Sequence, residues 1–137
     1  MIKRCGNCGS SKIATKNQKG KSFPWRDYEA VRLDASLNLI ECSECGELIL
    51  KDSDIGNLDE AVEQSIRKQV AQMVDKIIMR EDCSQVELAS HLGVSKEYLT
   101  EIKSGRKIPK FQLYNFLKTI AIEGKAYKAS DPKLLIA

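Results

Sequence analysis

Long apolar runs are missing from this sequence of 137 residues. The longest uncharged apolar stretches span only a few positions, as in residues 134–137, whereas a membrane-spanning helix needs about 20. No apolar stretch follows the first five residues, so an ordinary secretory signal is not expected. We therefore predict a cytoplasmic protein without a membrane segment.

Glycine and proline are scarce, with eight and three residues, and histidine occurs once, at His91. With a hydrophobic content of 42%, this scarcity argues against a wholly disordered or fibrous chain. A single histidine with no cysteine or histidine nearby in sequence is weak evidence for a metal pair or a general base. No group of residues unites a nucleophile, a base and an orienting partner, so we expect no enzymatic activity.

Charge of one sign is not in large excess, because 22 basic and 19 acidic residues leave a net charge of +3. The distribution is more informative. Residues 3–26 hold seven basic residues and no acidic one, residues 33–60 hold eight acidic residues against Lys51, and residues 95–110 hold five basic residues. Each block can also be an ordinary solvated surface.

Cysteine is concentrated near the start of the chain, as two C-x2-C pairs separated by 33 residues. In a reducing cytosol this pattern favours a metal site over disulfides. Two such turns can complete the tetrahedron that zinc prefers, with Zn–S bonds of about 2.3 Å. We predict one zinc ion per chain, held by Cys5, Cys8, Cys42 and Cys45.

Each cysteine pair is followed by a glycine, Gly9 or Gly46. Glycine reaches positive φ at little cost, so the chain can wrap around the sulfurs with its N–H groups facing them. Four thiolates leave no open coordination position, which indicates a structural ion. The alternative is thioredoxin-type redox chemistry, but that chemistry uses one C-x-x-C near a βαβ pattern, and here two occur without a convincing helix.

The cysteine-containing region has strand character, with extended segments expected at 11–17, 23–33 and 37–42. About 55 residues bury too little apolar surface to fold comfortably, and a metal ion is the usual remedy. Trp25 is either part of this small core or a contact residue for a partner.

The sequence becomes helical from about residue 55. Asn57 and Glu60 have the spacing of a capping box. Apolar residues then recur at helical intervals, which predicts a helix over 58–81, about 36 Å long. These residues are Leu58, Val62, Ile66, Val70, Val74, Ile77 and Ile78.

Residues 84–105 have the spacing of two helices joined by a tight turn. Ser84, with Glu87 three residues later, is expected to cap the first helix, and Ser95 the second. Gly93 permits the turn between them, and Gly105 ends the second helix. The residues expected to face inward are Val86, Leu88, Ala89, Leu92, Val94, Leu99 and Ile102.

This segment resembles the lambda-repressor/Cro (XRE) helix-turn-helix family. The matching positions are Ser84, Gln85, Glu87, Leu88, Ala89, Leu92, Gly93, Val94, Ser95, Ile102, Gly105 and Pro109. Cys83 occupies the family's small apolar position, which we interpret as a core position, and Lys103 replaces a frequent glutamate. The alternative is an ordinary pair of helices in a bundle.

The resemblance implies that the second helix lies in the DNA major groove. It places Lys96, Glu97, Tyr98 and Thr100 near base edges, while Gln85 contacts a phosphate. Lys103 faces DNA or solvent. The remaining residues expected to contact the DNA backbone are Arg106, Lys107 and Lys110.

An N-terminal zinc domain joined to an XRE domain resembles the MqsA-type (YgiT-like) antitoxins. Two further segments carry this resemblance, residues 42–53 and 131–135. It implies an α+β protein with a β-rich zinc domain at 1–55, a helical linker at 56–67 and an all-α, lambda-repressor-like helix-turn-helix domain at 68–137. It further implies a homodimer that represses its own operon by binding an operator in double-stranded DNA. A zinc-containing XRE regulator without a toxin is the alternative.

A ribonuclease toxin encoded by the adjacent gene is the partner that this family implies. Such a toxin presents a basic surface, which carboxylates of the zinc domain can meet, and strand-like residues 36–50 can offer an edge for β-pairing. The alternative is that the acids only balance the basic block at 3–26. The residues expected to contact the toxin are Glu41, Glu44, Glu47, Asp52 and Asp54.

Apolar residues near the C-terminus exceed what one small core needs, so we expect part of this set to form the dimer contact. They are Phe111, Leu113, Phe116, Leu117, Ile120, Leu134, Leu135 and Ile136.

Overall fold

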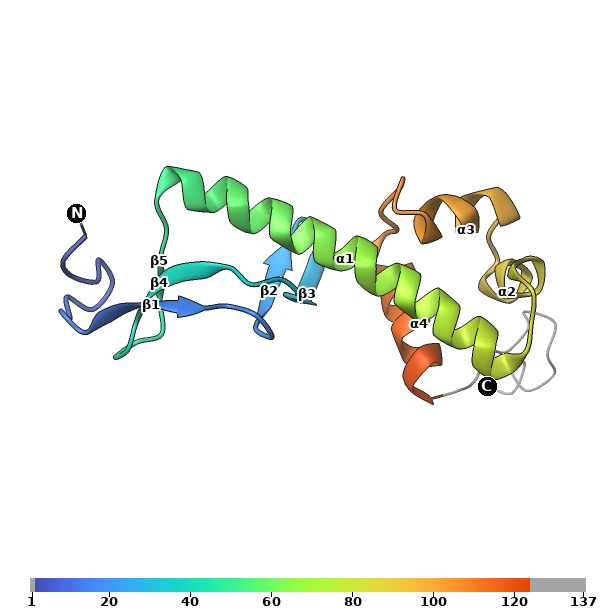
Figure 1. Cartoon of the computed structure of the whole chain (residues 1–137), viewed down its shortest axis with the longest axis horizontal. Coiled ribbons are helices and arrows are strands. Elements are labelled where there is room, and N and C mark those ends of the chain that lie inside the picture. Colours follow the sequence, from blue (N-terminus) through green and yellow to red (C-terminus); the bar gives the residue numbers. More distant parts are fainter. Residues whose placement is uncertain (1, 124–137) are drawn as a thin grey trace. The chain divides into compact units, whose positions relative to one another are not determined.

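A computed structural model describes residues 2–123 of the chain and has the predicted α+β class (Figure 1). Short strands come first and helices follow. The strands are β1 (Ile13–Asn17), β2 (Ser22–Trp25), β3 (Tyr28–Arg32), β4 (Asn38–Cys42) and β5 (Leu48–Ile49). The helices are α1 (Asp52–Glu81), α2 (Gln85–Leu92), α3 (Lys96–Lys103) and α4 (Phe111–Glu123). The chain divides into two compact units between Ser65 and Ile66, within α1, and each is considered by itself.

The first unit contains an antiparallel three-stranded sheet in the order β1–β4–β5. Its register places Ile13 opposite Cys42 and Asn17 opposite Asn38. This pairing connects the two cysteine turns, because the first turn precedes β1 and the second follows β4. Since β4 is paired on both sides, it offers no free edge to a partner, and within segment 36–50 only the two-residue β5 lies at an edge.

The extended segment expected at 23–33 is wrong as a single strand, because it forms the β2–β3 hairpin. Arg26 adopts a positive φ of 51° in the turn, so Trp25 and Tyr28 lie opposite each other. Both aromatic side chains are buried and meet edge to face, with ring centroids 5.8 Å apart. The Arg26 guanidinium lies 4.4 Å from the centre of the indole ring.

Trp25 is a core residue, with only 6% of its surface exposed. Its indole Nε1–H donates a hydrogen bond of 2.8 Å to a carboxylate oxygen of Asp59, in the first half of α1. The backbone N–H of Asp34 similarly donates to the Ser65 hydroxyl at 2.9 Å. These two bonds attach the first part of α1 to the strands of the same unit.

Replacing Asp59 with alanine is expected to lower the free energy of unfolding of the first unit by about 1–3 kcal/mol, because the buried indole N–H loses its acceptor. Denaturant unfolding followed by tryptophan fluorescence measures this change. Glu60→Ala, at an exposed neighbouring carboxylate, is the matched control and should be nearly neutral. Equal stabilities of the two variants would contradict this role of Asp59.

The capping box expected at Asn57 and Glu60 is wrong, since α1 begins six residues earlier than residue 58, at Asp52. The Lys51 backbone N–H donates to the Asp54 carboxylate at 3.0 Å, and Lys51 accepts the first helical bonds. Asp52 and Asp54 also place negative charge in the first turn, where the helix dipole favours it. Helix formation therefore continues through Asn57, although asparagine is a poor helix former.

The second unit has a core built from all four helices. The buried apolar side chains are Ile66, Val70, Val74 and Ile77 of α1, Leu88 and Ala89 of α2, Leu99 and Ile102 of α3, and Tyr114, Leu117, Ile120 and Ala121 of α4. The Tyr114 hydroxyl donates to the buried Gln69 amide oxygen. Arg80 donates to the Ala121 carbonyl at 2.6 Å, which satisfies an acceptor in the last turn of α4.

One expectation for this unit is wrong. Val86 does not face inward, because 54% of its surface is exposed. Of the apolar residues near the C-terminus, Leu117 and Ile120 belong to the core of the unit, whereas Phe116 is exposed. Leu134, Leu135 and Ile136 lie outside the described residues.

Candidate metal centre and candidate nucleic-acid interface

The two cysteine turns have the same local geometry. In the first, the Gly9 N–H donates to the Cys5 carbonyl at 2.9 Å, and in the second the Gly46 N–H donates to the Cys42 carbonyl at 2.9 Å. Both glycines have φ of 76°, a conformation that side chains rarely adopt, as their positions after the cysteines predicted. The turns therefore direct their sulfurs toward the same point.

The four sulfur atoms form one cluster, in which all lie within 4.8 Å of one another. The Sγ atoms of Cys5 and Cys45 are 3.6 Å apart, and those of Cys8 and Cys42 are 3.5 Å apart. Sulfurs of a tetrahedral site with bonds of about 2.3 Å are separated by about 3.8 Å. These four residues can therefore hold a single metal ion, as the sequence predicted.

Hydrogen-bond donors surround the sulfurs. Asn7 serves both turns, because its backbone N–H donates to the Cys5 sulfur at 3.4 Å and its side-chain amide donates to the Cys45 sulfur at 3.6 Å. The Glu47 backbone N–H, followed by the Asn7 amide, lowers the pKa of Cys45 to about 7. Asn7 was not predicted from the sequence, although its place inside the first C-x2-C pair is a usable signal.

The cluster has a buried side and an exposed side. Cys5 and Cys42 are buried, with 3% and 1% of their surfaces exposed, whereas Cys8 and Cys45 reach the surface. The Asn7 amide therefore supports the sulfur of an exposed ligand. Mutation of a group that holds a metal ligand in this way commonly lowers the metal affinity 10–100-fold.

Asn7→Ala is expected to weaken metal retention by about 10-fold or more, because the Cys45 sulfur loses a donor that stabilises its charge. Competition with a chromophoric chelator measures the affinity. Asn115→Ala, at an exposed asparagine of α4 in the other unit, is the control and should behave as the wild type. Identical retention by the Asn7 and Asn115 variants would refute this contribution.

The acidic residues suggested for toxin binding are partly engaged within the first unit. Glu41 pairs with Lys16 at 3.4 Å and with Lys21, and the Lys21 ammonium in particular lowers the pKa of Glu41. Glu44 pairs with Lys12 at 3.0 Å, and Asp54 caps α1. Glu47 and Asp52 are exposed. The paired acids favour the charge-balance alternative for Glu41 and Glu44.

In the second unit, α2 and α3 are capped as the sequence predicted. The Ser84 hydroxyl accepts from the Glu87 N–H at 3.1 Å, and the Ser95 hydroxyl accepts from the Tyr98 N–H at 3.0 Å. Gly93, with φ of 73°, ends α2 and lets the chain turn into α3. The two eight-residue helices are thus joined by a short, fixed turn.

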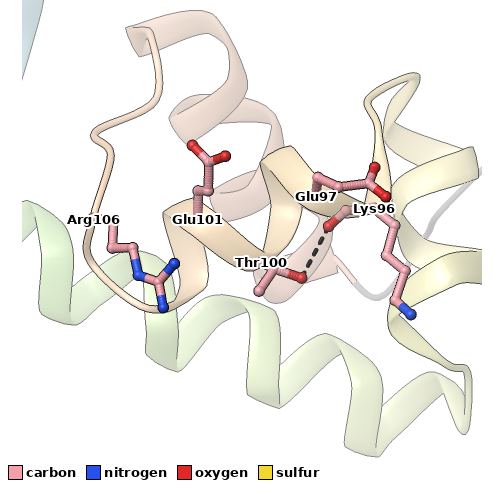
Figure 2. Close-up of a pocket in the computed structure, with 5 residues that line it drawn as sticks. All are labelled: Lys96, Glu97, Thr100, Glu101 and Arg106. Carbon is pink, nitrogen blue, oxygen red and sulfur yellow. Dashed lines mark hydrogen bonds between the residues drawn. The ribbon is translucent and has the colours of Figure 1, made fainter.

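The exposed side of α3 contains a shallow concavity of about 410 Å³ (Figure 2). Four of the five residues that line it were predicted as DNA-contacting, namely Lys96, Glu97, Thr100 and Arg106. Glu101 is the fifth. The Thr100 hydroxyl donates to the Lys96 carbonyl at 3.0 Å, as drawn in Figure 2.

Two of the suggested cations are engaged within the second unit. Lys103 pairs with Asp75 of α1 at 3.2 Å. Lys107 pairs with Glu101 at 2.8 Å, and the hydrogen bond and charge of that carboxylate raise the pKa of Lys107. Lys110 is exposed.

The remaining suggested contacts, Gln85 and Tyr98, are half-buried.

No known family model matches this sequence. A search of curated proteins likewise finds no match.

Cys83 and His91 lie outside the metal cluster. Both are half-buried, and burial, together with the nearby charge of Glu87, raises the pKa of the Cys83 thiol. A raised pKa disfavours the thiolate, which is the form that binds metals and acts as a nucleophile. Within the described residues, no helix is both long and apolar enough to cross a bilayer.

Proposed function

We propose that this protein is a sequence-specific DNA-binding transcriptional repressor with one structural zinc ion. The observation that carries the proposal is the α2–α3 pair, in which two capped helices meet at Gly93 and α3 keeps a polar, cation-bearing side exposed. Such a pair has the properties of a helix-turn-helix, whose second helix reads the major groove.

The exposed cations divide into two groups. Lys96 lies at the start of α3, where side chains of a reading helix meet base edges. Arg106 and Lys110 follow the helix and are suited to phosphates. Lys103 and Lys107 already pair with Asp75 and Glu101, so we assign them a smaller part in DNA affinity than the sequence suggested.

Zinc is the ion that best fits four thiolates in a closed cluster. Thiolates are soft ligands, which disfavours magnesium and calcium. Four protein ligands would leave no position for a substrate or an activated water, so we assign the ion a structural task and propose no enzymatic activity.

A homodimer is part of this proposal, because a two-fold repressor binds a palindromic operator. Exposed apolar residues of the second unit support self-association, with Phe116, Met79 and Ile122 exposed by 44%, 82% and 69%. Light scattering at micromolar concentration should give twice the mass of the chain. The mass of a single chain under these conditions would contradict the proposed homodimer.

The antitoxin role is the finer part of the proposal and rests on the family resemblance. The exposed carboxylates of Glu47 and Asp52, with the exposed apolar Leu50, offer a surface for a basic ribonuclease toxin. Co-purification of the full chain with the product of the adjacent gene tests this role. If that product never associates with the chain, the alternative of a regulator without a toxin is correct.

The DNA-binding function is tested by selection from a pool of duplexes with a randomised central segment. We expect a palindromic consensus whose half-sites lie about 10 bp apart, or a multiple of that distance. The control is a variant carrying Gly93→Val, which forces a β-branched side chain into positive φ and distorts the turn. Failure of the wild type to enrich any sequence would refute the proposal.

A further inference from the structure

Two carboxylates lie on the exposed side of α3, and their surroundings differ. Glu101 is bound by Lys107 at 2.8 Å. By contrast, no ion pair or hydrogen bond engages the Glu97 carboxylate within residues 2–123. Both line the concavity of α3, with Glu97 at the start of the helix and beside Lys96 (Figure 2). The two acids therefore have different tasks.

Glu101 holds the segment that follows α3. Its backbone carbonyl accepts from the Arg106 N–H at 3.0 Å and from the Lys107 N–H at 3.3 Å, while its carboxylate binds the Lys107 ammonium. Arg67 of α1 donates to the Gly105 carbonyl in the same segment. The segment after α3 is thus held by the backbone carbonyl of Glu101, and one oxygen of the Glu101 carboxylate pairs with the Lys107 ammonium.

The Thr100 hydroxyl, like the Glu101 carboxylate, is already engaged within the protein, which leaves the Thr100 methyl group for contact with a base. Its hydroxyl hydrogen is committed to the Lys96 carbonyl at 3.0 Å. The side chain can still approach the apolar C5-methyl of a thymine. Glu97 lies one residue beyond Lys96 and three before Thr100, so the Glu97 and Thr100 side chains are neighbours on the same side of α3.

The chemistry of base edges limits what Glu97 can accept. An ionised carboxylate is an acceptor only. In the major groove guanine presents the acceptors O6 and N7, and thymine presents O4, so both repel it. Adenine offers an amino group beside the acceptor N7, whereas cytosine offers its N4 amino group alone. Cytosine is therefore the base that a carboxylate fits best.

We propose that Glu97 is a specificity-determining residue of α3 and selects a cytosine in each half-site by accepting a hydrogen bond from its N4 amino group. This inference rests on the proposed DNA-binding function. A carboxylate at this position also repels phosphates, so it lowers the affinity for unrelated DNA. The hydrogen bond to cytosine offsets that repulsion only in duplexes that carry the selected base pair.

A purely structural task for Glu97 has to be separated from this one. A carboxylate in the first turn also stabilises the helix through its dipole. That effect changes the stability of the protein, but it does not depend on any atom of the DNA. The decisive readout is therefore the coupling between Glu97 and a single amino group of the duplex.

The experiment uses the full-length protein and the duplex that it selects from a randomised pool. Each cytosine of the half-site is replaced in turn by pyrimidin-2-one, which lacks the amino group, and affinities are measured for the wild type and Glu97→Ala. At one position per half-site the replacement should weaken the wild type about 5- to 150-fold, the equivalent of 1–3 kcal/mol, and leave Glu97→Ala unaffected. Glu97→Gln should shift the preference there toward adenine, which glutamine binds through two hydrogen bonds.

Each outcome separates the two proposals. If the wild type selects no duplex, the DNA-binding function itself fails. If it selects a duplex but Glu97→Ala is as sensitive as the wild type to every amino deletion, DNA binding stands and the role of Glu97 is overturned. Far-UV circular dichroism of each variant checks that the helices are retained. The amino deletion also weakens base pairing in the duplex, but this effect is the same for the wild type and for Glu97→Ala.

Discussion

Removal of the metal is expected to unfold the first unit and leave the second largely helical. The strands bury few apolar side chains, so we expect a metal ion held by the four thiolates to supply much of the stability of this unit. The sequence contains one tryptophan, Trp25, and it is buried in this unit. Chelation under reducing conditions should therefore shift its fluorescence to longer wavelength, and zinc should restore it.

Cysteine variants supply the control for that result. Cys42→Ser removes a buried ligand and should abolish stoichiometric metal binding, whereas Cys83→Ser, outside the cluster, should retain one ion per chain. The helices of the second unit should preserve most of the far-UV circular dichroism in every case. Unchanged tryptophan emission in fully metal-free protein would contradict the stabilising role of the ion.

Reversal of charge at two exposed residues of the α3 concavity is expected to lower DNA affinity more than about 100-fold at 0.1 M salt, because each new carboxylate repels the phosphates that the cation attracted. The double variant is Lys96→Glu with Arg106→Glu, and neither position is buried. Affinity is measured by fluorescence anisotropy with the selected duplex across a series of salt concentrations.

Two matched variants test whether the effect is local to α3. Lys118→Glu makes a single reversal at an exposed position of α4 and should cost far less. Lys107→Ala should change the salt dependence little, because that ammonium already pairs with Glu101. A loss of affinity at Lys118 equal to that at the α3 positions would place the DNA-binding surface elsewhere.

The metal cluster could be predicted because its determinants are local and chemical. Two C-x2-C turns, each followed by a glycine, specify the ligands and the positive φ that follows them. The strand pairing that brings Cys42 beside the first turn was not needed for that inference. Capping of α2 and α3 was predictable for the same reason, since Ser84 and Ser95 act on N–H groups three residues away.

Contacts that depend on the tertiary arrangement of helices and loops could not be predicted in this way. The pairing of Lys103 with Asp75, or of Lys107 with Glu101, depends on how helices and loops meet, and it decides which cations stay available. The same limit applies to the acidic residues of the first unit, where Glu41 meets Lys16 and Lys21.

The ends of helices and strands were also predicted poorly from the sequence, for two physical reasons. The early start of α1 depends on a single carboxylate, Asp54, reaching the Lys51 N–H, and on packing that overrides the low helix propensity of Asn57. The break between β2 and β3 depends on Arg26 entering positive φ, which its residue type does not favour. Periodicity alone also misplaced Val86, which lies on the exposed side of α2.

Footprinting of the zinc-loaded, full-length protein on the DNA upstream of its own gene is the sharpest test of sequence-specific DNA binding. We expect two protected half-sites with centres about 10 bp apart, or a multiple of that distance. Protection should disappear with the Lys96→Glu, Arg106→Glu variant, provided that its metal content and helicity are unchanged. Absence of any protected site at saturating concentrations of metal-loaded wild type, or equal protection by the variant, would contradict it.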